Sequence, residues 1–210
     1  MSTAANIATP ASELNAERLR GLVGQAFFRP RDAADLGVNA YRLQGLVKGG
    51  TVERVGRGLY RWAAATTSEH YSLGAMCARV PGAIVCLLSA LVVHRLGTQL
   101  PRELWMAIPH KARPPRVAEF PIRVIRFSSA SLHYGVQDIA FEGVPARITS
   151  PARTVVDCFR FRRIVGKDVA LEALREALRD RKASADEIWR AAEVCRAKSL
   201  VGPALEVLST

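Results

Sequence analysis

Five polar or aromatic side chains in the first third of this 210-residue chain stand at helical spacing and could contact nucleic acid. They are Asn39, Tyr41, Arg42, Gln44 and Lys48. Amide and guanidinium groups pair with base edges in the major groove, and cationic side chains contact phosphates. Arg57 stands between Gly56 and Gly58, as at a hairpin tip that enters a minor groove, and Arg54 and Arg61 lie within reach of phosphates. These residue types favour DNA binding.

A helix-turn-helix followed by a β-hairpin would present these side chains. The sequence predicts helices over residues 31–36 and 40–48, a turn over 37–39 and a hairpin over 51–62. Pro30 suits the first position of one helix, and Asn39 suits the cap of the next. Ser12 is expected to cap an earlier helix that ends near Gly24. Arg31, in the first turn of its helix, joins the predicted DNA-binding residues.

Two other interpretations of this region stay open. Helical hairpins followed by a β-ribbon also occur in protein-interaction modules, where Arg57 would be an ordinary solvated tip. An outward aromatic residue such as Tyr41 is about as often a packing residue as a ligand contact. DNA binding is favoured because helix, tight turn, helix and hairpin follow in the required order.

The rest of the chain predicts a mixture of helices and strands with a helical end. Helices are expected over 68–80, 84–96, 151–164, from 168, from 184 and over 200–208, and strands over 104–108, 122–127, 137–141 and 146–149. Ser150 before Pro151, and Ser184 before two acidic residues, are typical helix starts. The predicted fold class is α+β. A winged helix-turn-helix over 1–66 precedes a mixed α/β domain over 67–210, whose part from 151 is a small helical bundle.

The charge balance favours a polyanionic partner. The chain holds 30 Lys and Arg against 19 Asp and Glu, which gives a net charge of +11, and the excess is spread along the chain. Of the 30 cations 25 are arginine. Arginine suits bidentate phosphate contacts, although a GC-rich coding genome produces the same bias.

Cysteine usage and hydropathy favour a cytoplasmic protein without a membrane span. The cysteines at 77, 86, 158 and 195 show neither C-x-x-C nor zinc-site spacing, as expected of reduced thiols in a core. The longest apolar run, 84–93, has ten residues, about half of the roughly 20 that a spanning helix needs. No signal peptide is expected, because residues 1–19 lack a basic start followed by an apolar stretch.

No catalytic constellation is predicted, and neither a metal nor another cofactor. The four histidines stand far apart in the sequence, and no phosphate-binding glycine loop is found. His94 is interpreted as a helix-terminal or core histidine. Arg153 and Asp157, one helical turn apart, favour a structural ion pair over a catalytic one. An enzyme that processes nucleic acid through the middle domain is kept as an alternative.

Several blocks of sequence resemble the AbiEi antitoxin family. The segment 32–62, DAADLGVNAYRLQGLVKGGTVERVGRGLYRW, is similar to the family's N-terminal winged helix. The blocks LWMAIP at 104–109, IRVIRFS at 122–128, EGV at 142–144, TSPARTVVDCFR at 149–160 and DVALEALR at 168–175 are similar to its C-terminal domain. Together these similarities extend over about residues 12–208.

This resemblance implies the antitoxin of a bacterial type IV toxin-antitoxin, or abortive infection, system. Such proteins repress their own operon by binding inverted repeats in double-stranded DNA, and counteract a nucleotidyltransferase-like toxin without a stable complex. The matching DNA-binding positions are the helix 39–48 and the hairpin 54–61. The block 151–163 is a candidate antitoxin surface, with Arg153, Arg160, Arg162 and Arg163. A winged-helix regulator without a toxin is the alternative within the same class.

Overall fold

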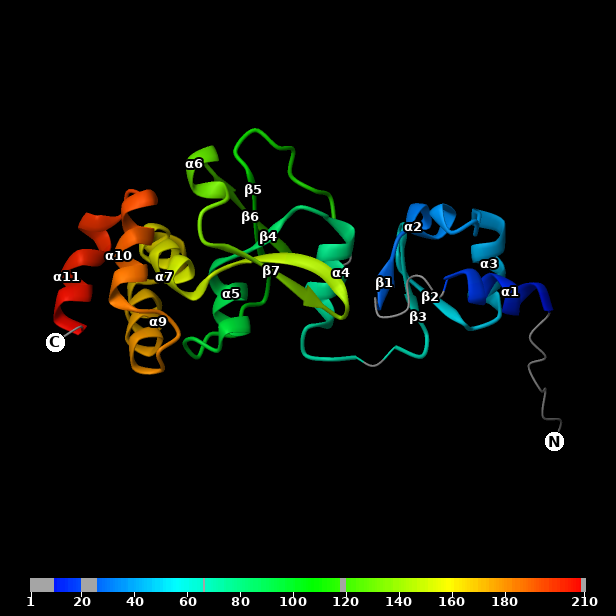
Figure 1. Cartoon of the computed structure of the whole chain (residues 1–210), viewed down its shortest axis with the longest axis horizontal. Coiled ribbons are helices and arrows are strands. Elements are labelled where there is room, and N and C mark those ends of the chain that lie inside the picture. Colours follow the sequence, from blue (N-terminus) through cyan, green and yellow to red (C-terminus); the bar gives the residue numbers. More distant parts are fainter. Residues whose placement is uncertain (1–9, 20–25, 66, 118–119, 209–210) are drawn as a thin grey trace. The chain divides into compact units, whose positions relative to one another are not determined.

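The computed structural model of the protein describes residues 10–19, 26–65, 67–117 and 120–208 (Figure 1). It is a mixed α+β structure with two sheets, which confirms the predicted class. The chain forms two compact units, Met1–Pro81 with Ala140–Pro145, and Gly82–Ile139 with Ala146–Thr210. Residues 67–81 group with the first unit, whereas the sequence predicted a domain boundary at 66.

Within its described residues, the first unit combines four helices with a small antiparallel sheet. Its elements are α1 (Pro10–Arg18), β1 (Phe27–Phe28), α2 (Pro30–Asp35), α3 (Ala40–Lys48), β2 (Val52–Gly56), β3 (Leu59–Trp62) and α4 (Tyr71–Arg79). The strands lie in the order β1-β3-β2. A core of Leu19, Phe28, Ala33, Val38, Leu43, Leu46 and Val52 holds α1, α2 and α3 against this sheet.

Two expectations for the start of this unit need correction. Helix α1 begins at Pro10, so Ser12 lies inside the helix and is not its cap. Strand β1 was not expected, because two consecutive phenylalanines show no alternation; it pairs Phe27 with Arg61 and Phe28 with Tyr60. The expected helix end near Gly24 lies outside the described residues.

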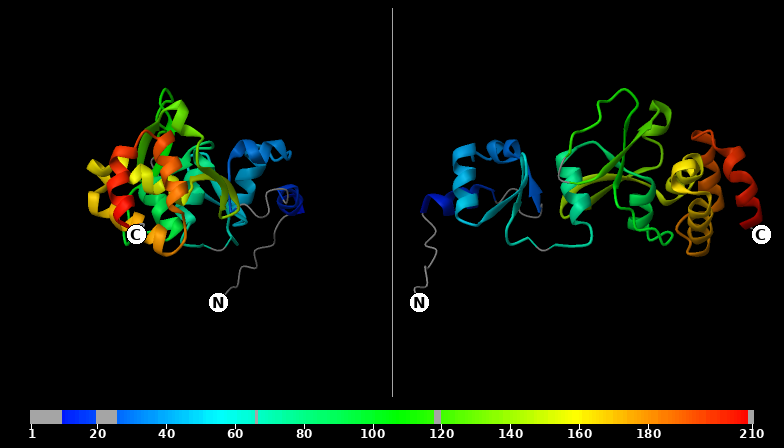
Figure 2. Two further views of the ribbon diagram at one scale, coloured as in Figure 1. Left: turned by 60° about the vertical axis from the view of Figure 1, so that its left-hand side comes forward. Right: turned by 180° about the vertical axis from the view of Figure 1, so that it is seen from behind.

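The second unit packs helices on a five-stranded sheet. Its elements are β4 (Ile84–Val85), α5 (Leu87–His94), β5 (Leu104–Pro109), β6 (Ile122–Phe127), α6 (Ser129–Leu132), β7 (Val136–Phe141), β8 (Val144–Thr149), α7 (Pro151–Arg160), α8 (Arg162–Val165), α9 (Lys167–Arg179), α10 (Ala185–Val194) and α11 (Lys198–Leu208). The strand order is β6-β5-β4-β8-β7, and the tip of the β7–β8 hairpin groups with the first unit. Figure 2 shows α7, α9, α10 and α11 gathered next to one another.

The apolar run from residue 84 is not the single helix that was expected. Ile84 and Val85 form strand β4, which pairs with β5 and β8, and the helix begins at Leu87. Cys86 caps that helix in an extended conformation (φ −146°). Periodicity cannot separate a buried strand from a buried helix within one apolar run.

Candidate nucleic-acid interface

Helix α3 presents a polar face to solvent and an apolar face to the core. Leu43 and Leu46 are 2% and 0% exposed and anchor the helix. All five side chains that the sequence assigned to the outward face are exposed, and Tyr41, at 85%, is among the most exposed large residues described. The spacing of the two leucines therefore turns positions 39, 41, 42, 44 and 48 outward together.

The start of α3 is held by its own polar groups. Asn39 caps the helix, and its side-chain Oδ1 accepts a hydrogen bond from the backbone N–H of Arg42 at 3.0 Å. The Arg42 guanidinium Nη1 donates to the carbonyl of Gly37 at 3.0 Å. Among the described residues, Gln44 and Lys48 have no hydrogen-bond or ion-pair partner, so their side chains are available for an external ligand.

The β2–β3 hairpin places Arg57 at an exposed turn beside Gly58, whose φ of +72° favours glycine. Arg54 is exposed on β2, with its Nε 3.4 Å from the carbonyl of Gly56. Arg31, on α2, is 68% exposed and forms a 3.6 Å ion pair with Asp32. All three arginines are thus exposed to solvent.

Arg61 does not occupy the outward position that was expected for a phosphate contact. Its side chain is 12% exposed and lies 3.6 Å from the carboxylate of Glu53. It donates a 2.5 Å hydrogen bond to the carbonyl of Ala65, and its guanidinium lies 5.3 Å from the ring centre of Tyr71. We therefore remove Arg61 from the predicted DNA-binding residues and assign it to the packing of the first unit.

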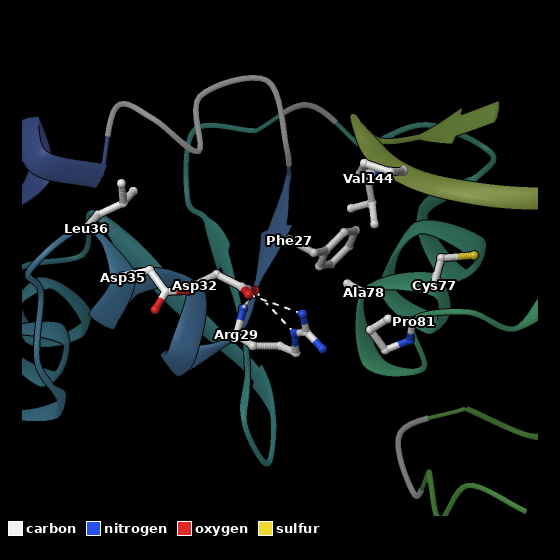
Figure 3. Close-up of a pocket in the computed structure, with 10 residues that line it drawn as sticks. Phe27, Arg29, Asp32, Asp35, Leu36, Cys77, Ala78, Pro81 and Val144 are labelled. Atoms are coloured by element: carbon white, nitrogen blue, oxygen red, sulfur yellow. Dashed lines mark hydrogen bonds and ion pairs between the residues drawn. The ribbon is translucent and has the colours of Figure 1, made fainter. Parts of the chain in front are cut away.

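A cavity of about 420 Å³ lies beside α2 in the first unit (Figure 3). Its wall includes apolar residues from β1, α4 and the β7–β8 tip, among them Phe27, Ala78 and Val144. The backbone N–H and the guanidinium of Arg29 donate hydrogen bonds to the carboxylate of Asp32 at the start of α2. Burial raises the pKa of Asp32, but these hydrogen bonds outweigh it and hold the pKa below its usual value. This ion pair stabilises the start of α2.

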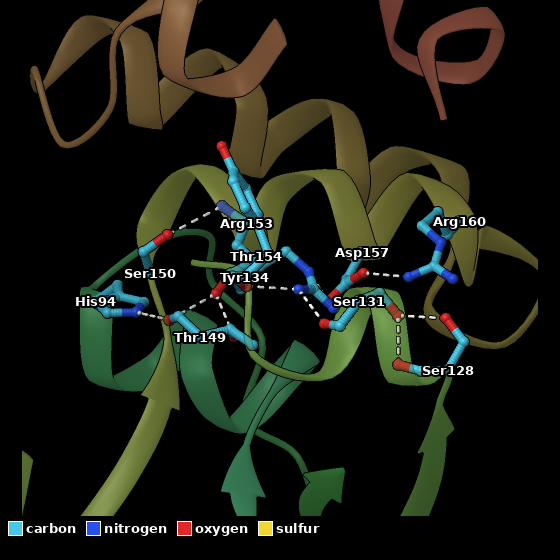
Figure 4. Close-up of polar contacts among 10 residues, drawn as sticks. All are labelled: His94, Ser128, Ser131, Tyr134, Thr149, Ser150, Arg153, Thr154, Asp157 and Arg160. Carbon is cyan, nitrogen blue, oxygen red and sulfur yellow. Dashed lines mark hydrogen bonds and ion pairs between the residues drawn. The ribbon is translucent and has the colours of Figure 1, made fainter. Parts of the chain in front are cut away.

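Arg153, one of the candidate antitoxin residues, lies inside the second unit (Figure 4). It is 0% exposed, its Nε donates to Asp157 at 2.8 Å, and its Nη1 donates to the carbonyls of Ser131 and Tyr134. The guanidinium also covers the ring of Phe127, 4.7 Å from its centre. The predicted ion pair with Asp157 is confirmed, but a surface role for Arg153 is wrong.

The remaining three arginines of this segment are less enclosed. Arg160 is 23% exposed and donates to Asp157 at 2.8 Å. Arg162 donates to the carbonyl of Phe159, and Arg163 is exposed. Complete burial raises the pKa of Asp157, against the lowering effect of the two guanidinium groups. Of the four candidate antitoxin residues, only Arg163 has an exposed side chain.

No group of three or more His, Cys, Asp or Glu in the parts of the chain that the structure describes could hold a metal ion. The Nε2 of His94 lies 2.6 Å from the carbonyl of Thr149, so this histidine is tied to β8, as expected of a structural residue. All four cysteines are buried, and burial raises the pKa of Cys77 to about 12. None of the helices in these parts has the length and apolar character needed to cross a membrane.

Comparison with known proteins supports the resemblance to the AbiEi family in the first unit. Residues 17–63 match the family described as "Transcriptional regulator, AbiEi antitoxin". This segment spans α2, α3 and the β2–β3 hairpin, so the elements of the candidate interface are similar to those of a family of regulators.

A solved structure shows a similar fold over most of the chain. RV2827C protein from Mycobacterium tuberculosis matches with a TM-score of 0.54 and 16% identity, over 91% of this chain and 77% of that one. At this identity the similarity concerns the fold alone. No curated protein matches the sequence.

Proposed function

We propose that the first unit is a winged helix-turn-helix that binds double-stranded DNA, with α3 in the major groove and the β2–β3 hairpin as the wing. The observation that carries this proposal is the face of α3, where five side chains with hydrogen-bonding or aromatic groups are exposed on a helix anchored by two buried leucines. Base contacts from such a helix concentrate in its N-terminal part. Arg31, Arg54 and Arg57 then contact the backbone around the helix.

We further propose that the chain is the antitoxin of a type IV toxin-antitoxin system and represses its own operon at inverted repeats. The family match over 17–63 supports the regulatory part. The second unit is assigned the antitoxin activity, directed against a nucleotidyltransferase-like toxin without a stable complex. Arg163 is the candidate residue that remains exposed there. The protein acts in the cytoplasm, without a cofactor and without catalysis of its own.

DNA binding is tested with a duplex from the region upstream of the protein's own gene and a scrambled duplex of equal length. We expect tight binding to the first and weaker binding to the second. Affinity should fall steeply with salt, because phosphate contacts release counterions. Equal affinity for both duplexes would contradict sequence-specific repression and leave only a general nucleic-acid binder.

Antitoxicity is tested by co-expression with the neighbouring gene. We expect that gene to arrest growth by itself, and this chain to restore growth. A Gln44→Ala variant should still restore growth, because the DNA-binding face is separate from the antitoxin activity. If the neighbouring gene is harmless while specific DNA binding persists, the protein is a winged-helix regulator without a toxin. Turnover of DNA or tRNA by the pure protein would instead favour the alternative that the chain is an enzyme that processes nucleic acid.

A further inference from the structure

Two guanidinium groups from different helices converge on a single carbonyl oxygen in the first unit. The Nη1 of Arg42 on α3 donates to the carbonyl of Gly37 at 3.0 Å, and the Nη1 of Arg18 on α1 lies 3.5 Å from the same oxygen. Both side chains are exposed. Gly37 has φ +79°, and a Cβ atom there would lie 3.6 Å from the Arg18 Nη1. The turn before α3 therefore needs glycine, and the arginine lies directly beside it.

This arrangement brings like charges together without an acidic partner. Within the described residues, no carboxylate forms an ion pair with Arg18 or Arg42. One carbonyl can compensate only part of the charge of two guanidinium groups. An anion that accepts hydrogen bonds from both would remove the repulsion, and the planar fork of arginine matches the oxygen geometry of phosphate.

We propose that Arg18 and Arg42 form a clamp for one phosphodiester of the DNA backbone at the turn between α2 and α3. This inference rests on the proposed function and adds α1 to the elements that hold DNA. Arg18 was not among the DNA-binding residues predicted from the sequence. The clamp also changes the role of Arg42, because a guanidinium bonded to the carbonyl of Gly37 lies at the helix start and contacts the DNA backbone. Gln44 and Lys48 then remain to contact the bases.

The test measures the affinity for a random-sequence duplex over a series of salt concentrations, with Arg18→Ala, Arg42→Ala and the double variant. Each lost phosphate contact reduces the slope of log affinity against log salt by about 0.9. We expect the double variant to lower the slope by about that amount, and each single variant to lower it by less and to weaken binding to every sequence by the same factor. On a duplex that the wild type binds in one register, replacement of the clamped phosphate by a neutral methylphosphonate should weaken binding by the wild type and leave binding by the double variant unchanged.

Two controls separate the clamp from the loss of general positive charge and from loss of fold. Arg175→Ala removes an exposed arginine from α9 in the other unit and should leave the slope unchanged. Arg18→Lys keeps the charge without the fork and should recover part of the slope. A wild-type slope in Arg18→Ala, with binding by the wild type intact, overturns the clamp alone. Absence of duplex binding by the wild type overturns the proposed function.

Discussion

The buried ion pair of α7 offers a direct test of what holds the second unit together. Asp157 is 0% exposed and accepts hydrogen bonds from Arg153 and Arg160, both at 2.8 Å. In Asp157→Ala the guanidinium of Arg153 would stay buried without a counter-charge. Removal of one partner from such a pair costs about 3–5 kcal/mol of the free energy of unfolding.

The same reasoning predicts a different cost for each partner. Arg153→Met leaves Asp157 paired with Arg160. It also removes the hydrogen bonds that Arg153 donates to the carbonyls of Ser131 and Tyr134 in the wild type. We expect the free energy of unfolding to fall by about 2–4 kcal/mol, because one ion pair of Asp157 is lost while the other remains, and two carbonyl groups are left unsatisfied. The double variant Arg153→Met with Asp157→Ala should be less destabilised than the sum of the two single variants, since it leaves neither partner of this buried pair unpaired.

The assay is urea unfolding followed by far-UV circular dichroism, with Arg163→Met as the exposed control on α8. The control should stay within about 0.5 kcal/mol of the wild type. The reasoning is refuted if Asp157→Ala loses less than about 1 kcal/mol, or if the losses of the two single variants simply add in the double variant.

Three further predictions follow from particular contacts. Gly135→Ala should lower the free energy of unfolding by about 1–3 kcal/mol in the same assay, because φ is +60° and the new Cβ would lie 2.9 Å from the Cβ of Arg153. Wild-type stability of this variant would contradict the prediction and show that the loop can move to accommodate the methyl group. Asn39→Ala should cost about 1 kcal/mol through loss of the α3 cap, whereas Asn39→Ser should cost less; equal losses would count against a capping role. Burial lowers the pKa of His94, so the unfolded chain gains a proton below about pH 6.5 that the folded chain resists. The free energy of unfolding should therefore fall on acidification through that range. Between pH 7.5 and 5.5 the His94→Gln variant should lose less of it than the wild type, and an equal loss in both proteins would refute the assignment of this pH dependence to His94.

Local signals predicted much of the interface. Asn39 before a helix with leucines at 43 and 46 determines both the start of α3 and the face it exposes, so the outward residues follow from spacing alone. The glycines at 56 and 58 similarly located the hairpin turn. In these places local propensity and tertiary packing favour the same structure.

Residues whose roles depend on distant partners could not be placed in this way. Arg61 is the one charged residue of β3, and a charged strand residue is ordinarily expected at the surface. Contacts with Glu53, Ala65 and Tyr71 enclose it. Arginine is rarely buried, so the sequence predicted the pairing of Arg153 with Asp157 and not its depth. An available signal was the apolar character of Val155, Val156, Cys158 and Phe159 around this pair, which indicates a helix enclosed on most sides.

The central claim is that the outward face of α3 reads DNA sequence, and it is tested most directly by the preference of the Gln44→Ala variant. The measurement compares the dissociation constants of the wild type and the variant for a duplex selected by the wild type and for its single-base-pair variants. The account predicts that the variant loses about 1–3 kcal/mol of discrimination at one base pair and keeps it elsewhere. Unchanged discrimination at every position would contradict the assignment of α3 as the recognition helix.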